Sequence, residues 1–132
     1  MMRTYILREG YSMNRYDNFF LPVDNLDKAV KYYSETLGLK IKFNFADRGM
    51  VAFHVGNEEP ALILKDTTKY ADAKPTIWFV VDDVATEYER LLEKGVHFIT
   101  KPFKIGTGMS AEFEDDFGNR LGITDYSNRG NQ

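Results

Sequence analysis

A short motif that occurs twice constrains the fold of this chain more than any other feature of its sequence. Residues 23–26 read Val-Asp-Asn-Leu and residues 81–84 read Val-Asp-Asp-Val, and each motif follows an apolar run. Each leads into an amphipathic stretch that stops at a glycine, Gly38 in the first case and Gly95 in the second. Asp and Asn side chains cap helix starts and glycine ends helices, so the sequence predicts one helix in each half.

Short strands are expected on both sides of each predicted helix. The segments before the helices are rich in aromatic and β-branched residues, as strands are. After each helix the sequence predicts three further strands separated by turns, while residues 101–108, with a proline and two glycines, are expected to form a flap or an ordinary loop. The predicted strands are residues 18–23, 41–45, 50–55 and 61–65 in the first half and 76–81, 97–100, 109–114 and 120–125 in the second.

Each half of the chain therefore reads strand, helix, strand, strand, strand. One such half leaves a face of its sheet bare, and pairing of two halves solves this problem. The sequence predicts an α+β fold over residues 16–132, with βαβββ modules at approximately residues 16–66 and 75–126. Residues 1–15 fall outside the repeat and are predicted to form an arm or an extra edge strand, and Met13 is an alternative start.

Composition excludes several classes of function. The chain has no cysteine, so it has no disulfide, no thiolate metal site and no cysteine nucleophile. Its net charge of −3 and pI near 5.4, without a basic cluster, argue against nucleic acid as a partner. No apolar run is long enough to predict a membrane span, and the N-terminus lacks the apolar core of a secretory signal, so a cytoplasmic protein is expected.

Three segments resemble one known superfamily. Residues 18–29 (NFFLPVDNLDKA) resemble the opening module of the vicinal oxygen chelate superfamily, which includes glyoxalase, bleomycin-resistance proteins and extradiol dioxygenases. Residues 79–84 (FVVDDV) and 115–121 (DDFGNRL) resemble its second-half helix entry and its late turn. The resemblance covers roughly residues 16–126 and implies a glyoxalase-like fold around a central cavity, often completed at a homodimer interface.

The resemblance also implies where a metal cofactor would be held. Enzymes of the superfamily usually bind a divalent cation with four side chains, one from the first and one from the last strand of each module. By position these fall on Asn18, approximately Leu64, Thr76 and Gly122. None of them offers the imidazole nitrogen or carboxylate oxygen that such a cation needs. The sequence thus departs from the metalloenzyme pattern at all four positions, and no cofactor is expected.

The four positions at which the family holds its metal ion, together with neighbouring residues on the same strand faces, predict a site for an organic ligand. Phe20 and Trp78 lie two residues after Asn18 and Thr76, so each shares a strand face with the position that the family uses. Aromatic surface with a few polar anchors suits a planar or amphipathic small molecule, although these aromatic residues can also simply fill a core. The predicted ligand-binding residues are Asn18, Phe20, Leu64, Thr76, Trp78, Arg120 and Gly122.

Three functional hypotheses follow. The first is a metal-independent binding protein of the bleomycin-resistance type, expected to be a homodimer, that sequesters or senses an aromatic or amphipathic ligand. The second is a metal-dependent lyase, isomerase or dioxygenase whose ligands are displaced to His54 and Glu112. The third is a subunit in which the fold serves only as an interaction surface. The identity of the ligand, and whether a reaction is catalysed, stay open.

Overall fold

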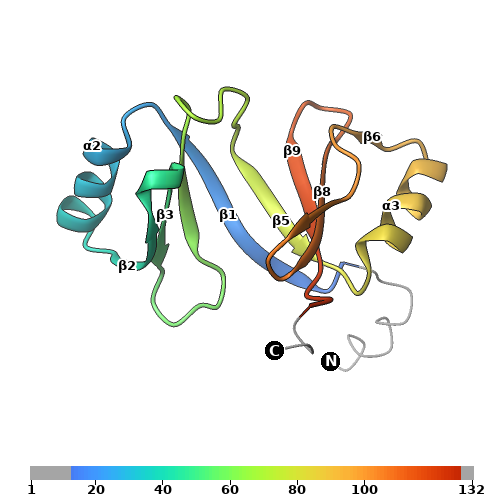
Figure 1. The fold of residues 1–132 in the computed structure, drawn as a ribbon, viewed down its shortest axis with the longest axis horizontal. Helices are drawn as coiled ribbons and strands as arrows, with labels where there is room; N and C mark the ends of the chain where they lie inside the picture. The colour runs from blue at the N-terminus through green and yellow to red at the C-terminus, as the bar shows by residue number, and fades with distance from the viewer. Residues whose placement is uncertain (1–12, 129–132) are drawn as a thin grey trace. The chain divides into compact units, whose positions relative to one another are not determined.

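The computed structural model describes residues 13–128 of the chain (Figure 1). These residues form two compact units. The N-terminal unit consists of residues 17–77. The C-terminal unit consists of residues 78–128 together with residues 13–16, which precede the N-terminal unit in the chain. Most of the predicted arm, residues 1–12, lies outside the described residues.

The N-terminal unit follows the predicted order of strand, helix and three strands. Its strands are arranged in the order β2-β3-β4-β1, with β1 and β4 parallel and the other neighbours antiparallel (Figure 1). The α+β class predicted from the sequence is therefore confirmed. The elements are β1 (Arg15–Val23), α2 (Leu26–Lys31), η2 (Tyr32–Thr36), β2 (Lys40–Phe45), η3 (Ala46–Arg48), β3 (Met50–His54) and β4 (Leu62–Asp66).

The first predicted helix is present, but its second half is not α-helical. Asn25 caps α2 as expected, since its side chain accepts a hydrogen bond of 3.0 Å from the backbone N–H of Lys28. From Tyr32 the chain continues as a π-helix, in which the N–H of Leu37 donates to the carbonyl of Tyr32 at 3.0 Å. The apolar spacing along this segment fits both helix types, so the sequence could not distinguish them.

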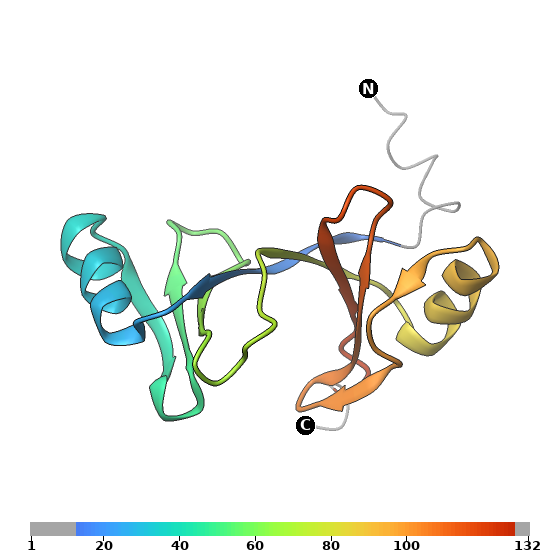
Figure 2. The same cartoon turned by 90° about the horizontal axis from the view of Figure 1, so that it is seen from above.

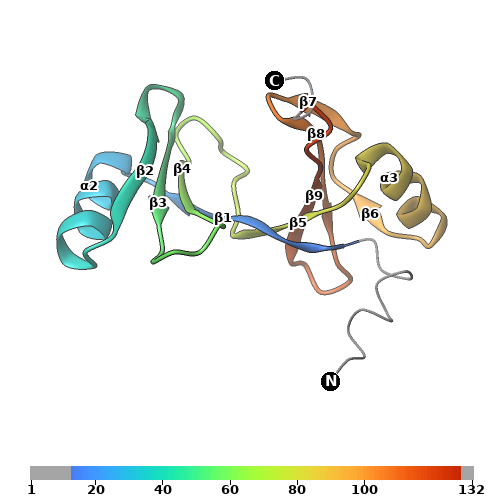
Figure 3. The same ribbon diagram turned by 90° about the horizontal axis from the view of Figure 1, so that it is seen from below.

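The helix covers one face of its sheet and leaves the other face free of any helix of the unit (Figure 3). Val51 and Phe53 of β3 pack under α2, and the ring of Tyr33 lies 5.8 Å from that of Phe53. Ala52, between them in the chain, points to the opposite face because side chains alternate along a strand. This helix-free face of the N-terminal unit is formed by Phe20, Phe43, Met50, Ala52, Ala61 and Ile63.

The C-terminal unit repeats the arrangement with one additional strand. Its order is β5-β9-β8-β6, and β7 pairs with β8 in an antiparallel hairpin. The expectation of a flap or loop over residues 101–108 is therefore wrong for its central part. Gly108 packs tightly there, because a Cβ at this position would lie 2.3 Å from Oδ1 of Asp125. The elements are β5 (Thr76–Val80), α3 (Val84–Glu93), β6 (His97–Phe98), β7 (Phe103–Ile105), β8 (Gly108–Glu114) and β9 (Arg120–Thr124).

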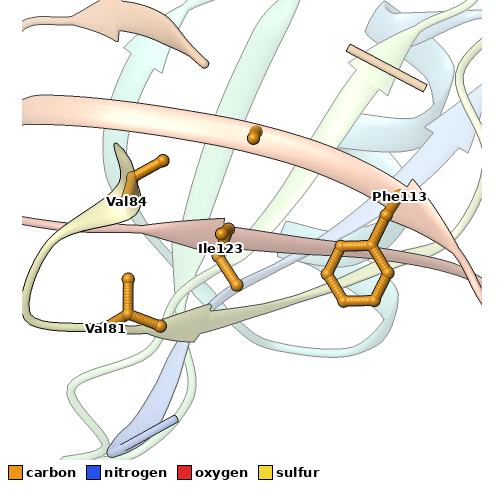
Figure 4. Close-up of a cluster of buried hydrophobic side chains, with 5 residues drawn as sticks. Val81, Val84, Phe113 and Ile123 are labelled. Atoms are coloured by element: carbon orange, nitrogen blue, oxygen red, sulfur yellow. The ribbon is translucent and has the colours of Figure 1, made fainter. Parts of the chain in front are cut away.

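Helix α3 is capped by Asp83, whose carboxylate accepts hydrogen bonds from the backbone N–H of Thr86 at 2.9 Å and its hydroxyl at 2.7 Å. The helix packs on one face of the sheet (Figure 2). The core beneath it is apolar, and Tyr88 extends it by packing on Phe98 at 4.6 Å between ring centroids. Figure 4 shows the core residues Val81, Val84, Phe113 and Ile123, which cluster with Ala111.

None of the helices within residues 13–128 has both the length and the apolar character that crossing a bilayer would require.

Candidate functional site

The face of the C-terminal sheet opposite α3 carries polar and charged side chains. Ala111 and Phe113 of β8 point into the core, so Ser110, Glu112 and Glu114 point the other way. The register pairs these three with Thr124, Gly122 and Arg120 of β9, respectively. The helix-free face of the C-terminal unit is formed by these six residues and by Trp78 of β5, which contacts Gly122.

The ring of Trp78 lies directly on the backbone of Gly122. A Cβ at position 122 would be 2.4 Å from Cε3 and 2.5 Å from Cζ3 of the ring, far inside van der Waals contact. Trp78 itself is 7% exposed. Glycine at position 122 is therefore required for this packing, and the indole takes the space into which a side chain from that position would project.

Arg120 is held between two carboxylates on the same face. Its Nη1 lies 3.1 Å from Oε1 of Glu112, and its Nη2 lies 3.5 Å from Oε2 of Glu114. The Arg120 side chain is 9% exposed, and its Nε has no hydrogen-bond partner among the described residues. The two carboxylates fix the orientation of the guanidinium, and its Nε–H is buried without an acceptor among the described residues.

The turn between β8 and β9 sets the register that brings these charges together. Asp115 accepts hydrogen bonds from the side-chain amide of Asn119 at 2.8 Å and from the backbone N–H of Phe117 at 2.8 Å. The Asn119 amide is the main reason why the pKa of Asp115 lies below its usual value. Because this turn fixes the hairpin, Arg120 is opposite Glu114 and diagonal to Glu112.

The predicted residues of β1 lie on the helix-free face of the N-terminal unit. Asn18 accepts a hydrogen bond of 2.9 Å from the backbone N–H of Ala61, so its side chain stabilises the start of β4. Phe20 packs with Ile63 on that face. The prediction for Leu64 is wrong, because Leu64 is fully buried under α2 with Val51 and Phe53. If the alignment to the family is shifted by one residue along β4, the corresponding position is Ile63, which lies beside Phe20 on the helix-free face.

Thr76 is buried at the start of β5, and its hydroxyl donates to the carbonyl of Lys74 at 2.8 Å. It belongs to the N-terminal unit, with Asn18, Phe20 and Leu64. The structure thus brings together Trp78, Arg120 and Gly122 within the C-terminal unit. Of the remaining four predicted residues, Asn18 and Phe20 lie on the helix-free face of the N-terminal unit, Leu64 lies under α2, and Thr76 lies at the start of β5.

The residues at the four family positions do not fit a divalent metal ion. Gly122 has no side chain and its space holds the Trp78 ring, while Leu64 is in the hydrocarbon core. Asn18 and Thr76 offer only neutral oxygens, and both side chains already bond to backbone groups. Across residues 13–128 there is also no cluster of three His, Asp or Glu side chains with metal-binding geometry.

The alternative metal ligands that the sequence suggested, His54 and Glu112, do not form a metal site either. Glu112 is engaged by Arg120 in the C-terminal unit. His54 is exposed at the end of β3 in the N-terminal unit, directly opposite Lys40 of β2. The pairing of Arg120 with Glu112 and Glu114 was not predicted, although the length of the intervening turn is the signal from which the hairpin register could have been derived.

Comparison with known proteins identifies the relatives of this chain. The sequence profile of the Glyoxalase/Bleomycin resistance protein/Dioxygenase superfamily matches residues 15–123. The uncharacterized protein YurT of Bacillus subtilis (strain 168) is 32% identical over 115 residues, which span 76% of this chain and 91% of YurT.

Solved structures show the same fold at low sequence identity. A methylmalonyl-CoA epimerase of Streptomyces coelicolor, in complex with 2-nitronate-propionyl-CoA, is 17% identical with a TM-score of 0.68, over 88% of this chain and 99% of that one. A superfamily member from Vibrio splendidus 12B01 is 12% identical with a TM-score of 0.61, over 82% and 95% of the two chains. The glyoxalase-like fold implied by the sequence is confirmed.

Proposed function

Because this chain belongs to the Glyoxalase/Bleomycin resistance protein/Dioxygenase superfamily, we propose that it is a member that binds a small molecule without a metal ion. The ligand is aromatic or amphipathic, and the protein sequesters or senses it. The protein acts in the cytoplasm as a homodimer. The observation that carries this proposal is the packing of the Trp78 ring on Gly122.

That packing supports metal independence. In the metalloenzymes that the sequence resembles, a ligating side chain projects from the position of Gly122. Here a side chain at position 122 would collide with the indole, whose nearest ring atom would be 2.4 Å from the Cβ. A metal bound in the family manner would therefore require both a substitution at position 122 and a displacement of Trp78.

The helix-free face of the C-terminal unit supports an aromatic or amphipathic ligand. The Trp78 indole is the aromatic group of this face and is 7% exposed, so we place the ligand against the part of the ring that stays accessible. Aromatic surface contributes most of the binding free energy in sites of this kind. Arg120 supplies the polar group of this face, a guanidinium whose orientation is fixed by Glu112 and Glu114. An amphipathic molecule has an apolar part and a polar group, which match the Trp78 ring and the Arg120 guanidinium, respectively.

The test uses the single tryptophan of the chain as its reporter. The intact protein, purified without chelators, is titrated with a panel containing indole, naphthol and decanoate while tryptophan emission is recorded. Calorimetry then compares the Trp78→Ala variant with wild-type protein. We expect the dissociation constant of any ligand found to rise at least about tenfold, because truncation removes the central aromatic contact.

Phe117→Ala is the matched control, since Phe117 is an aromatic residue of the same unit and is 87% exposed at the hairpin tip. It should bind the ligand as wild-type protein does. An unchanged dissociation constant in Trp78→Ala would rule out this site. Stoichiometric nickel, zinc, iron or manganese in the purified protein would contradict metal independence, and light scattering that shows only monomer would contradict the homodimer.

A further inference from the structure

A depression at one end of the β2–β3 hairpin carries basic and polar groups that the proposed ligand site does not use. It belongs entirely to the N-terminal unit and has a volume of about 500 Å³. Its lining contains one ammonium group, one imidazole and one side-chain amide, and no carboxylate. The lining residues are Gly38, Leu39, Lys40, His54, Gly56 and Asn57.

Strand register places the two basic groups side by side. Lys40 of β2 is directly opposite His54 of β3 in an antiparallel pair. Side chains at directly opposed positions project to the same face, with their Cβ atoms about 5 Å apart. The Lys40 ammonium and the His54 imidazole therefore lie side by side, and an anion bound between them can accept a hydrogen bond from each.

These side chains are available to a ligand. Within residues 13–128, Lys40, His54 and Asn57 form no side-chain hydrogen bond or ion pair. Lys42, two residues along the same strand, differs in this respect, because its Nζ donates to the backbone carbonyl of Glu59 at 3.2 Å.

Two glycines keep the depression open. Gly38 and Gly56 have φ angles of +76° and +56°, and a Cβ at either position would meet no atom within 4 Å. The left-handed backbone explains why glycine stands at these turns, and the missing side chains leave room above the backbone. Glu58 and Glu59 follow Asn57 in the turn, but neither lines the depression.

We propose that this depression binds an oxyanion, either the phosphate or the carboxylate group of a small molecule. The ammonium of Lys40 and the imidazole of His54 hold the anion from two adjacent strands, and the amide of Asn57 donates a third hydrogen bond. The site is independent of the proposed function, because it shares no residue with the helix-free face of the C-terminal unit.

The test is a titration of the isotope-labelled full chain with inorganic phosphate and, separately, with acetate, followed by amide chemical shifts at constant ionic strength. We expect saturable shifts at Gly38, Gly56 and Asn57. In Lys40→Gln, the affinity for the anion should fall about tenfold, because a charge-assisted hydrogen bond is lost. Lys42→Gln removes the same charge from the same strand outside the lining and should retain the wild-type affinity.

The two anions distinguish a phosphate site from a carboxylate site, and saturation by either one supports the proposal. Equal weakening in Lys40→Gln and Lys42→Gln would overturn it, because the shifts would then reflect diffuse attraction to positive charge. Shifts that rise linearly with both anions would also overturn it. The amide spectrum of each variant shows directly that it is folded, so loss of affinity is separated from loss of structure.

Discussion

The carboxylate of Asp125 accepts a hydrogen bond of 2.8 Å from the backbone N–H of Val84, the first residue of α3. Its other oxygen accepts from the backbone N–H of Met109 in β8 at 2.9 Å and from the hydroxyl of Ser127 at 2.8 Å. Asp125 is 1% exposed. A single buried side chain therefore joins the helix start, β8 and the chain after β9.

We expect Asp125→Ala to lower the free energy of unfolding by about 3 kcal/mol, because it leaves the buried N–H groups of Val84 and Met109 without an acceptor. Urea denaturation followed by circular dichroism measures the change. Asp116→Ala is the control, since it removes an exposed carboxylate of the same unit, and it should change stability by less than about 0.5 kcal/mol. Equal effects of the two substitutions would contradict the structural importance of Asp125.

The same carboxylate makes stability depend on pH. Burial would raise the pKa of Asp125, but the hydrogen bonds from Val84, Met109 and Ser127 outweigh it, so the pKa lies below the usual value of 3.8. A lowered folded-state pKa contributes stability that is fully present above 3.8 and is lost as the pH falls through the folded-state value. Urea midpoints measured from pH 7 downward should show a smaller acid loss in Asp125→Asn than in wild-type protein.

The contact between Trp78 and Gly122 predicts an unusually costly small substitution. In Gly122→Ala the added methyl group would lie 2.4 Å from the indole, so the ring must shift, and overpacking of this kind costs about 1–3 kcal/mol. Thermal or urea unfolding measures the loss, and tryptophan emission reports the movement of the ring. In a Trp78→Ala background the same substitution should cost much less, and additive effects would contradict the contact.

The guanidinium of Arg120 lies between the carboxylates of Glu112 and Glu114 and offsets the repulsion between them. Arg120→Gln leaves Glu112 and Glu114 without their cation, and we expect a loss of about 2 kcal/mol, since both acids are mostly buried. Adding Glu112→Gln to this variant removes the repulsion and should restore part of the stability. Urea unfolding of the single and double variants checks the prediction, which fails if the second substitution destabilises the protein further.

Much of the fold could be predicted because the sequence signals that start and end its helices involve only neighbouring residues. The capping side chains of Asn25 and Asp83, and the glycines after both helices, fixed the two modules without knowledge of tertiary contacts. The assignment of Leu64 failed because a shift by one residue reverses the face of every side chain in a strand, and β4 is apolar on both faces.

The candidate site could be predicted only in part. Arg120 and Trp78 could be placed on strands by their period, but which partners they meet depends on the hairpin register and on the packing of β5 beside β9. The short strand β7 was missed because its residues lie between a proline and two glycines, which indicate a loop. Tertiary pairing with β8 overrides that local preference.

The packing of an indole on a bare backbone also limits how the sequence can change. A carboxylate acquired at position 122 would meet the ring at once, so a mutation toward Glu is disfavoured while Trp78 is present. A smaller residue at position 78 would remove this collision. Each of the two positions therefore limits which substitutions the other tolerates, and we expect them to change together.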